Sequence, residues 1–285
     1  MIKAIAIVAN PKSANVERVL LELVDILKRY RVDVLLEKRA AGILHLNWHT
    51  SHDEIRNRAD VIIVLGGDGT VLSAARLADD REIPLLTIHM GRLGFITEFC
   101  VDEIHEAIDA LFKNELGTRK RMRLSCDIVD PDGESVYHEH ALNEIALIKG
   151  GIANMIEFEV YSNNEMVNLY KADGFIVSTP TGSTGYALST GGPVIDPNLS
   201  LMLLTAIAPH SLFSRSLVVA DDSYIKIQII TERHDIFVTQ DGQVGRNLKV
   251  GESLIIKKTA FNTVLFAKPN VNFYRHLREK FFWGK

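Results

Sequence analysis

A run of apolar residues that ends in three glycines around one carboxylate is the strongest chemical signal in this sequence. It reads Val61-Ile62-Ile63-Val64-Leu65-Gly66-Gly67-Asp68-Gly69-Thr70, and 71–77 follows with helical spacing. The apolar run is typical of a strand buried on both faces. A strand that stops in glycines before a helix brings backbone N–H groups and a helix N-terminus to one point, where proteins commonly hold phosphate. Asp68 would repel that phosphate unless a metal ion or a reacting hydroxyl lies between them. The stretch therefore favours phosphoryl transfer, and the alternative is a plain strand-to-helix turn.

A second candidate site interrupts an apolar segment, Ala141-Leu142-Asn143-Glu144-Ile145-Ala146. The Asn143 amide donates and accepts hydrogen bonds, whereas the Glu144 carboxylate only accepts them. Together they suit a base edge and a pair of ribose hydroxyls. The alternative is a strand edge with two polar side chains that face solvent.

The third candidate is the stretch 171–193, in which glycine and small hydroxyl residues dominate around one aromatic, Tyr186. Such a loop brings backbone close to a ligand, while Tyr186 supplies a stacking face and the hydroxyls supply hydrogen bonds. A long loop inside a compact domain is uncommon unless it is functional. This stretch is therefore predicted to line a binding pocket.

The elements that must position these residues differ between the two halves of the chain. The first half alternates strands and amphipathic helices, which predicts a βαβ unit with a parallel sheet. We expect Asp102 to cap the last of these helices and the segment 40–57 to be an irregular connection. The expected elements are strands at 2–8, 32–36, 61–65 and 85–88 and helices at about 14–30, 71–77 and 103–113.

The second half reads as mainly β, with turn signals between short strands. The basic run Arg119-Lys120-Arg121, with Arg123 beyond it, is interpreted as a solvated linker face, and Asp241-Gly242 as a hairpin turn. A final helix over 271–283 is expected to pack back on the first domain. The expected strands are 124–129, 135–139, 141–148, 157–160, 175–178, 224–230, 236–239, 253–257 and 263–267. The predicted fold is thus an α/β domain with a parallel sheet (1–118, joined by 268–285) and a β-rich domain (119–267).

Composition excludes several classes of protein. The 285 residues carry a net charge of -4, which argues against a general nucleic-acid binder. No apolar run is long enough to span a membrane, and the N-terminus does not resemble a secretion signal. Two cysteines cannot build a disulfide framework or a zinc site unaided. These features predict a soluble, reduced, cytoplasmic protein.

Histidines provide weaker signals. His45, His49 and His52 fall at helical spacing, but no carboxylates match them for metal binding. His138 and His140 flank Glu139 on a predicted strand, which indicates a solvent-exposed face of the sheet. We therefore expect no metal site built from protein side chains alone.

The chain resembles the NAD kinases, which phosphorylate the adenosine-ribose 2′-hydroxyl of NAD to give NADP. The resemblance covers nearly the whole chain. The glycine-aspartate motif also occurs in lipid kinases and phosphofructokinases, but its combination with the other segments is specific. Gly185 stands where alanine is common, and 211–216 only loosely follows the family's histidine-led segment, which leaves the roles of His210 and Arg215 open. The segments that carry the resemblance are Gly66-Gly67-Asp68-Gly69-Thr70, Gly91-Arg92-Leu93-Gly94-Phe95, Asn143-Glu144 and 173–193, with Thr179-Pro180-Thr181-Gly182-Ser183-Thr184 inside the last.

The resemblance implies a role for each site residue. Asp68 would accept the proton of the 2′-hydroxyl, since an aspartate is ionised at neutral pH. Gly66, Gly67, Gly69 and Thr70 would hold the donor phosphates, Phe95 would close the pocket, and Asp173 would reach in from a neighbouring subunit. The residues expected to contact NAD are Asp68, Gly69, Phe95, Asn143, Glu144, Lys171, Asp173, Thr181, Thr184, Gly185, Tyr186, Ser189 and Gln243.

The expected activity is an NAD kinase of NADP biosynthesis that uses ATP or polyphosphate with Mg²⁺ or Mn²⁺ and assembles as a homo-oligomer, a dimer or a tetramer. One rival is a kinase for a lipid or another small alcohol, which would need an apolar pocket that the hydroxyl-rich loop argues against. Another rival is a non-catalytic NAD(P)-binding sensor, which the intact Asp68 motif disfavours. The donor, and the choice between NAD and NADH, stay open.

Overall fold

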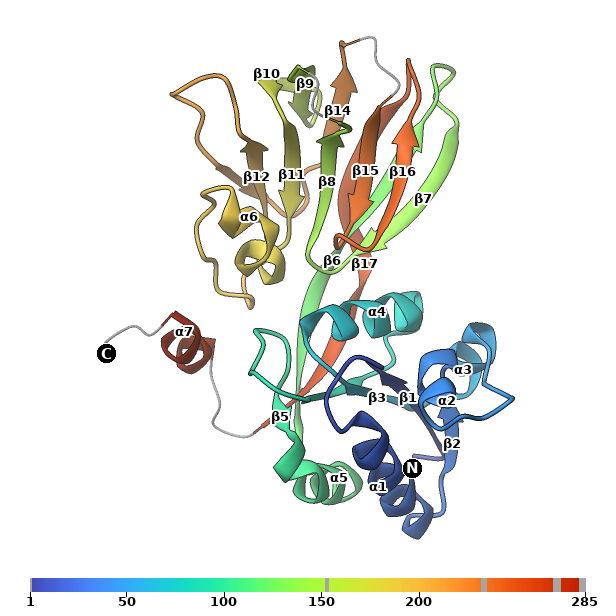
Figure 1. Cartoon of the computed structure of the whole chain (residues 1–285). Coiled ribbons are helices and arrows are strands. Elements are labelled where there is room, and N and C mark those ends of the chain that lie inside the picture. Colours follow the sequence, from blue (N-terminus) through green and yellow to red (C-terminus); the bar gives the residue numbers. More distant parts are fainter. Residues whose placement is uncertain (1, 152–153, 232–234, 269–272, 282–285) are drawn as a thin grey trace. The chain divides into compact units, whose positions relative to one another are not determined.

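A computed structural model describes residues 2–151, 154–231, 235–268 and 273–281 (Figure 1). The chain forms two compact units, residues 1–120 with 262–285 and residues 121–261. Two long strands, β6 and β17, contain the two boundaries within their own lengths. No helix among the described residues has the length and apolar character needed to cross a membrane.

The first unit alternates strands and helices. It also contains short 3-10 turns at Asp79–Arg81 and Val101–Glu103. Its strands are β1 (Ala4–Ala9), β2 (Asp33–Leu36), β3 (Val61–Leu65), β4 (Leu85–His89) and β5 (Phe99–Cys100), and its helices are α1 (Val16–Arg29), α2 (Lys38–Ile43), α3 (His52–Arg58), α4 (Asp68–Ala78), α5 (Ile104–Phe112) and α7 (Phe273–Phe281).

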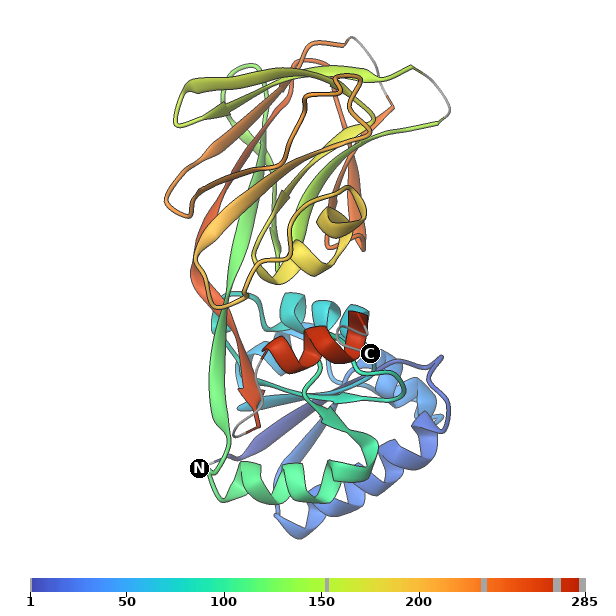
Figure 2. The same ribbon diagram turned by 90° about the vertical axis from the view of Figure 1, so that its left-hand side faces the viewer.

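The strands of this unit form the predicted parallel sheet. Their order is β4-β3-β1-β2, and β5 adds to β4, also in parallel. Every residue of β1 and β3 is buried, because α1 and α5 cover one face of the sheet and α4 the other (Figure 2). A buried parallel sheet explains why these strands read as unbroken apolar runs.

Two expectations for the first unit are wrong. The segment expected to be irregular contains α2 and α3, which are capped by side chains of Glu37, accepting from Arg39 N, and Ser51, accepting from Glu54 N. Such short helices bury too few residues to show a periodic pattern. Asp102 does not cap α5; it lies in a 3-10 turn, where the Glu103 carboxylate instead accepts the Cys100 N–H at 2.8 Å.

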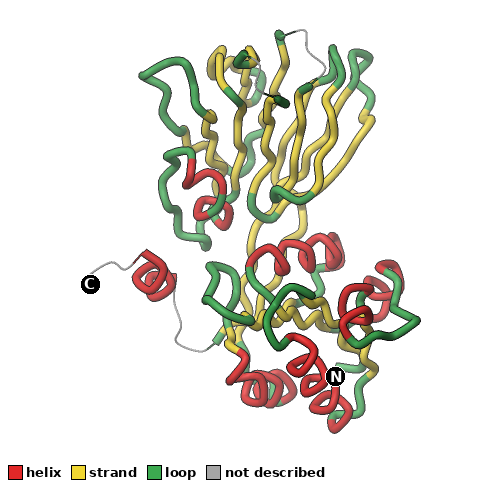
Figure 3. The backbone as a smooth tube through the Cα atoms, in the orientation of Figure 1, coloured by secondary structure: helices red, strands yellow, loops and turns green. Residues whose placement is uncertain are grey.

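The second unit is a sandwich of two β layers, and its strands are drawn in yellow in Figure 3. One layer is antiparallel, with the order β13-β12-β11-β8-β15-β16, and the other contains β10-β9-β14-β17 and the β6–β7 pair. Its elements are β6 (Gly117–Val129), β7 (Ser135–Ala141), β8 (Glu144–Lys149), β9 (Ile156–Ser162), β10 (Glu165–Ala172), β11 (Gly174–Ser178), β12 (Leu201–Ile207), β13 (Leu217–Ala220), β14 (Ile225–Ile229), β15 (Ile236–Gln240), β16 (Val244–Leu248) and β17 (Ser253–Ala267), with a 3-10 turn at Thr181–Thr184 and a short helix α6 (Tyr186–Ser189).

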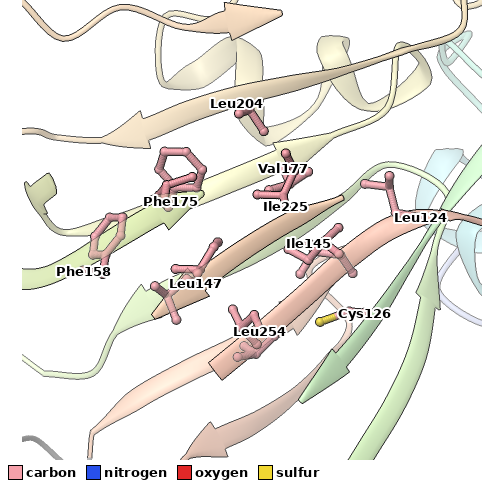
Figure 4. Packing of buried hydrophobic residues seen from close by; sticks show 14 of the residues in the cluster. Leu124, Cys126, Ile145, Leu147, Phe158, Phe175, Val177, Leu204, Ile225 and Leu254 are labelled. Atoms are coloured by element: carbon pink, nitrogen blue, oxygen red, sulfur yellow. The ribbon is translucent and has the colours of Figure 1, made fainter. Parts of the chain in front are cut away.

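Side chains from both layers share one hydrophobic core. Phe158 and Phe175 meet edge-on in this core, with ring centroids 5.7 Å apart, and Leu147 and Leu254 belong to the same cluster (Figure 4). The outer face of β8, β11 and β12 is covered by Ala187 of α6 and by Ile195. The glycine-rich stretch therefore lies against this sheet and is fixed by it.

Several predictions for the second half needed correction. The segments 253–257 and 263–267 are one strand, β17, and the strands β10, β12, β13 and β16 were not expected. The basic run is not a solvated linker throughout, since Arg121 is 7% exposed and Arg123 only 1%. The predicted hairpin at Asp241-Gly242 is confirmed; both residues have positive φ and join β15 to β16. Helix α7 confirms the final helix over 273–281, while the ends of the predicted range lie outside the described residues.

Candidate active site

Asp68 is the first residue of α4, directly after β3 and the two glycines. Gly67 is the N-cap of α4 and provides no side-chain cap. The Gly67 carbonyl accepts the N–H of Thr70 at 2.9 Å, which closes the first turn. A Cβ on Gly66 would lie 2.2 Å from the Thr70 hydroxyl oxygen, so only glycine fits there. The turn thus presents backbone and a helix N-terminus without intervening side chains, as a phosphate site requires.

The Asp68 carboxylate is held in place by the loop after β4. It accepts the N–H of Phe95 at 2.9 Å and the N–H of Ile96 at 3.1 Å, one on each oxygen. A Cβ on Gly94 would lie 1.9 Å from Asp68 Oδ1, so this position must also be glycine. A carboxylate offers about four acceptor sites, and two of them remain for a substrate hydroxyl. Asp68 is therefore oriented before any ligand arrives.

Phe95 contacts the C-terminal helix within the same unit. Its ring lies 5.7 Å from the Phe281 ring, and the Lys280 ammonium lies 5.7 Å from its centroid. Its backbone is fixed to Asp68 while its side chain is covered by α7. Phe95 thus links the carboxylate to this helix.

In the second unit, Asn143 and Glu144 lie where β7 turns into β8. Glu144 is 5% exposed, so the alternative of two solvent-facing polar residues at a strand edge is wrong for it. The buried side-chain oxygens Asn143 Oδ1 and Glu144 Oε2, together with Thr181 Oγ1, have no hydrogen-bond partner within the described part of the chain. Because buried polar atoms normally have partners, these three oxygens are candidates for contact with a polar ligand.

A residue that the sequence reasoning used only as a turn former holds this segment. The Asp241 carboxylate accepts the N–H groups of Leu142, Asn143 and Glu144 at 3.0, 2.7 and 3.2 Å. The predicted strand 141–148 is broken here, since β7 ends at Ala141 and β8 begins at Glu144. Asp241 lies almost a hundred residues away in sequence, and only its place in a hairpin beside β8 hinted at this contact.

Burial raises the pKa of both the Glu144 and the Asp241 carboxyl. Burial, followed by the nearby Asp241 charge, raises the pKa of Glu144 to about 8. Burial also raises the pKa of Asp241, and this effect outweighs the three backbone N–H donors that lower it. At neutral pH, Glu144 is thus largely protonated. A protonated carboxyl can donate a hydrogen bond as well as accept one.

The hydroxyl residues of the glycine-rich stretch divide into two groups. Thr179 and Ser183 use their hydroxyls to hold the loop, on Leu142 O at 2.6 Å and Pro180 O at 2.7 Å. The Thr184 hydroxyl donates to Thr181 O at 3.2 Å. The buried Thr181 hydroxyl oxygen is one of the three without a partner. Thr179, Ser183 and Thr184 therefore use their hydroxyls to shape the loop, whereas the Thr181 hydroxyl has no partner in the described part of the chain.

The structure brings Gly185 and Tyr186 to Glu144. A Cβ on Gly185 would lie 3.3 Å from Glu144 Oε2 and 3.5 Å from Asn143 Nδ2, and the Tyr186 backbone N–H donates to Glu144. Burial raises the pKa of the Tyr186 hydroxyl, and the charges of Asp173 and Glu144 raise it further. Tyr186 is 37% exposed, so its ring is accessible for stacking.

Other predicted contact residues have partners of their own. Asp173 forms an ion pair with Lys149 at 2.6 Å, and Lys171 forms an exposed one with Glu157 at 2.9 Å. Ser189 is an exposed residue at the end of α6. Gln243 lies in the hairpin turn after Asp241, with its N–H on Gln240 O at 3.0 Å.

The segment 210–216 is held mainly by hydrogen bonds to backbone carbonyl oxygens. The His210 N–H donates to Lys171 O at 2.9 Å, and the Arg215 guanidinium donates to Leu212 O and Ser214 O at 3.0 and 2.8 Å. Among the described residues, no group of three or more His, Cys, Asp and Glu side chains is arranged to hold a metal ion.

Both units match models of known protein families. The ATP-NAD kinase N-terminal domain matches residues 5–116, and the ATP-NAD kinase C-terminal domain matches residues 142–267. The NAD kinase of Geobacter metallireducens is 38% identical over 283 residues, 99% of each chain, and that of Thermoanaerobacter sp. is 40% identical over 227 residues, 80% of each.

Solved structures give the same result. Yeast NADH kinase complexed with NADH has a TM-score of 0.92 at 25% identity, with 100% of this chain and 89% of that chain covered. An NAD kinase from Archaeoglobus fulgidus in complex with ATP has a TM-score of 0.77 at 30% identity, with 97% and 98% covered. This chain belongs to the NAD kinase family, whose members transfer a phosphoryl group to NAD.

Proposed function

We propose that this chain transfers the γ-phosphoryl group of ATP to the 2′-hydroxyl of the adenosine ribose of NAD, with Asp68 as proton acceptor. The observation that carries this proposal is the Asp68 carboxylate, which two backbone N–H groups anchor beside a glycine turn at the N-terminus of α4. Its remaining acceptor sites suit a hydroxyl that loses its proton as the bond to phosphorus forms.

The first unit is proposed to bind the phosphoryl donor. The backbone of Gly66, Gly67, Gly69 and Thr70 lies at the start of α4, where the helix dipole and N–H groups favour an anion. Backbone N–H groups bind ATP and polyphosphate alike, so both donors fit. Transfer would then depend mostly on positioning and charge stabilisation.

A divalent metal fits this arrangement when it arrives with the donor. Mg²⁺ usually keeps several waters and binds through one or two carboxylates and the substrate phosphates. Asp68 is the carboxylate at the turn, which agrees with such a sparse donor set. When bound, Mg²⁺ or Mn²⁺ neutralises charge on the phosphates.

The second unit is proposed to bind NAD. Asn143, Glu144 and Thr181 supply three buried side-chain oxygens that lack a hydrogen-bond partner among the described residues, and these suit the amino group of the adenine and the hydroxyl groups of the ribose. Tyr186 supplies a stacking face. The remaining proposed contacts are Phe95, Lys171, Asp173, Thr184, Gly185, Ser189 and Gln243.

Exposed apolar side chains support the proposed homo-oligomer. Leu212 and Phe213 are 87% and 90% exposed, and Leu217 and Val218 of the edge strand β13 are also exposed. Apolar side chains in such a group are typical of protein–protein contacts. A Phe213→Lys variant should lower the mass measured by light scattering, and an unchanged mass would place the interface elsewhere.

The proposed location of the protein is the cytoplasm. Its two free cysteines and the ATP and NAD substrates suit that compartment.

The test of function is NADP formation from NAD, ATP and Mg²⁺, with polyphosphate and NADH as separate arms. Asp68→Asn should lose most of kcat and keep NAD affinity, because the acceptor site for the proton is removed. Asp102→Asn, an exposed acid of the same unit, is the matched control. Near-normal turnover by Asp68→Asn would remove Asp68 from its role. Turnover of a lipid alcohol but not NAD would favour the rival kinase class.

A further inference from the structure

A pair of histidines on β7 forms a second polar cluster that the proposed reaction does not use. His138 and His140 alternate along the strand, so both project from the same face of the sheet. Their Nε2 atoms lie 2.9 Å apart, and their rings are perpendicular, with centroids 4.6 Å apart. Two imidazole nitrogens with this separation share one small region of space beside the strand.

Neighbouring groups fix the His138 tautomer. Asp127 of the paired strand β6 lies opposite His138, and its Oδ1 is 2.7 Å from His138 Nδ1. The same oxygen accepts the Ser135 hydroxyl at 3.1 Å. The carboxylate therefore holds the proton on Nδ1, which leaves the His138 Nε2 lone pair directed away from β6 toward His140. The His140 ring is also supported, edge-on at 4.8 Å, by Phe261.

We infer that His138 and His140 form a binding site for a divalent transition metal of the Cu²⁺ or Ni²⁺ class, with both Nε2 atoms as ligands and Asp127 as the carboxylate behind His138. A carboxylate on the far ring nitrogen is the usual companion of a metal-binding histidine. This site does not rest on the proposed kinase activity.

The ligand type favours Cu²⁺ and Ni²⁺. Imidazole nitrogens suit Cu²⁺, Ni²⁺ and Zn²⁺, and the affinity of a given site is generally highest for Cu²⁺. Square-planar or tetragonal coordination by nitrogen and oxygen is typical of Cu²⁺ and Ni²⁺, so waters can complete a site that has two histidines. A tetrahedral Zn²⁺ site normally has three or four protein ligands. The 2.9 Å between the Nε2 atoms is the length of an N–H···N hydrogen bond, and it shows that both rings can reach one ion after they turn.

Exposure makes the site accessible. The His138 side chain is 50% exposed and that of Asp127 24%. In the contact between the two imidazoles the His140 Nε2 carries the proton, so metal binding requires this proton to move to His140 Nδ1 or to solvent. A ring rotation that turns both Nε2 lone pairs toward one point then breaks the contact and requires no change in the strand. Metal binding then replaces a hydrogen bond between rings by two metal–nitrogen bonds. Two protein ligands give a weaker site than three or four would.

The test uses CuCl₂, NiCl₂ and ZnCl₂ with the full-length protein, measured by calorimetry and, for Cu²⁺, by electron paramagnetic resonance. We expect one Cu²⁺ per chain, a resonance spectrum with two coordinated nitrogens, and affinity in the order Cu²⁺, Ni²⁺, Zn²⁺. His138→Ala and His140→Ala should each weaken Cu²⁺ binding on the order of 100-fold, since one of two protein ligands is lost. Asp127→Asn should weaken it by roughly 10-fold or more.

His105→Ala is the matched control, because His105 is also an exposed histidine paired with a carboxylate, Glu22, at 3.0 Å, but has no second histidine beside it in the described structure. It should bind Cu²⁺ like the unchanged protein. Thermal melts of every variant without metal show whether each folds. The proposal is overturned if folded His138→Ala and His140→Ala proteins bind Cu²⁺ as tightly as the unchanged chain, or if no saturable binding occurs.

Discussion

Glu144→Gln should change how the stability of the protein depends on pH. The Glu144 carboxyl is 5% exposed, and burial together with the Asp241 charge raises its pKa from 4.5 to about 8. Below pH 4.5 the carboxyl is protonated in both the folded and the unfolded chain, so its contribution to stability is complete. As pH rises, the unfolded chain ionises first, and the free energy of unfolding falls until the folded chain also ionises near pH 8.

The size of this effect follows from the pKa difference. Each pH unit between the two pKa values lowers the free energy of unfolding by up to about 1.4 kcal/mol. Over the whole window this sets a ceiling of about 5 kcal/mol for a single independent group. Glu144 is coupled to Asp241, so a loss of about 2 to 3 kcal/mol between pH 5 and pH 8 is the expected outcome. Glutamine cannot titrate and should remove this loss.

Urea unfolding of the ligand-free protein at pH 5, 6, 7 and 8 measures the effect. The stability of Glu144→Gln relative to the unchanged chain should increase steadily from pH 5 to pH 8. Glu103→Gln is the matched control. Although burial raises the pKa of Glu103, hydrogen bonds from the Cys100 N–H and the Lys268 ammonium lower it to about 2, so this group is ionised throughout the window. Parallel stability curves for Glu144→Gln and the unchanged chain would refute the reasoning.

Three further predictions concern the two units separately. Gly94→Ala should reduce kcat about 100-fold with the fold retained, because its Cβ would lie 1.9 Å from Asp68 Oδ1. Gly91→Ala should have a much smaller effect, because its Cβ would have no atom within 4 Å. Equal losses of kcat in the two variants would argue against the steric reason. Arg123→Met should lower the free energy of unfolding by about 3 kcal/mol in urea titrations, because Arg123 is 1% exposed and its charge stabilises ionised Asp241. Lys120→Met, at an exposed site, should change the free energy of unfolding little. Tyr186→Ala should mainly raise KM for NAD, as loss of a stacking contact does, and an unchanged KM would exclude the ring from the pocket.

The sequence predicted the parts of the fold that depend on local pattern. The strand Val61–Leu65 and the glycine turn after it were readable because a buried parallel strand and a helix start both leave a local signature. Strand β10 was missed because it has few buried residues and exposed apolar ones, Met166 and Leu169. Its apolar residues are therefore not confined to the buried face of the sheet, and the pattern of apolar and polar residues alone could not identify this strand.

The sequence suggested the residue types of the candidate site, but it did not indicate the contacts that support them. Asn143 and Glu144 were singled out from their place in an apolar segment, yet nothing in that segment indicates that Asp241 holds it. The burial of Arg123 was likewise hidden, since a basic residue in a basic run is normally solvated. Contacts between residues distant in sequence determine both features, and they depend on strand pairing that a single sequence does not specify.

Each unit uses a carboxylate to fix the backbone of a loop. Asp68 accepts two N–H groups from the loop after β4, and Asp241 accepts three from the turn before β8. Each anchor orients a loop before any ligand binds, which lowers the ordering entropy lost on binding. The same turn keeps Asn143 Oδ1 and Glu144 Oε2 buried without a partner among the described residues, at a cost in stability. A ligand that satisfies these oxygens should therefore stabilise the second unit by more than its contact area alone would suggest.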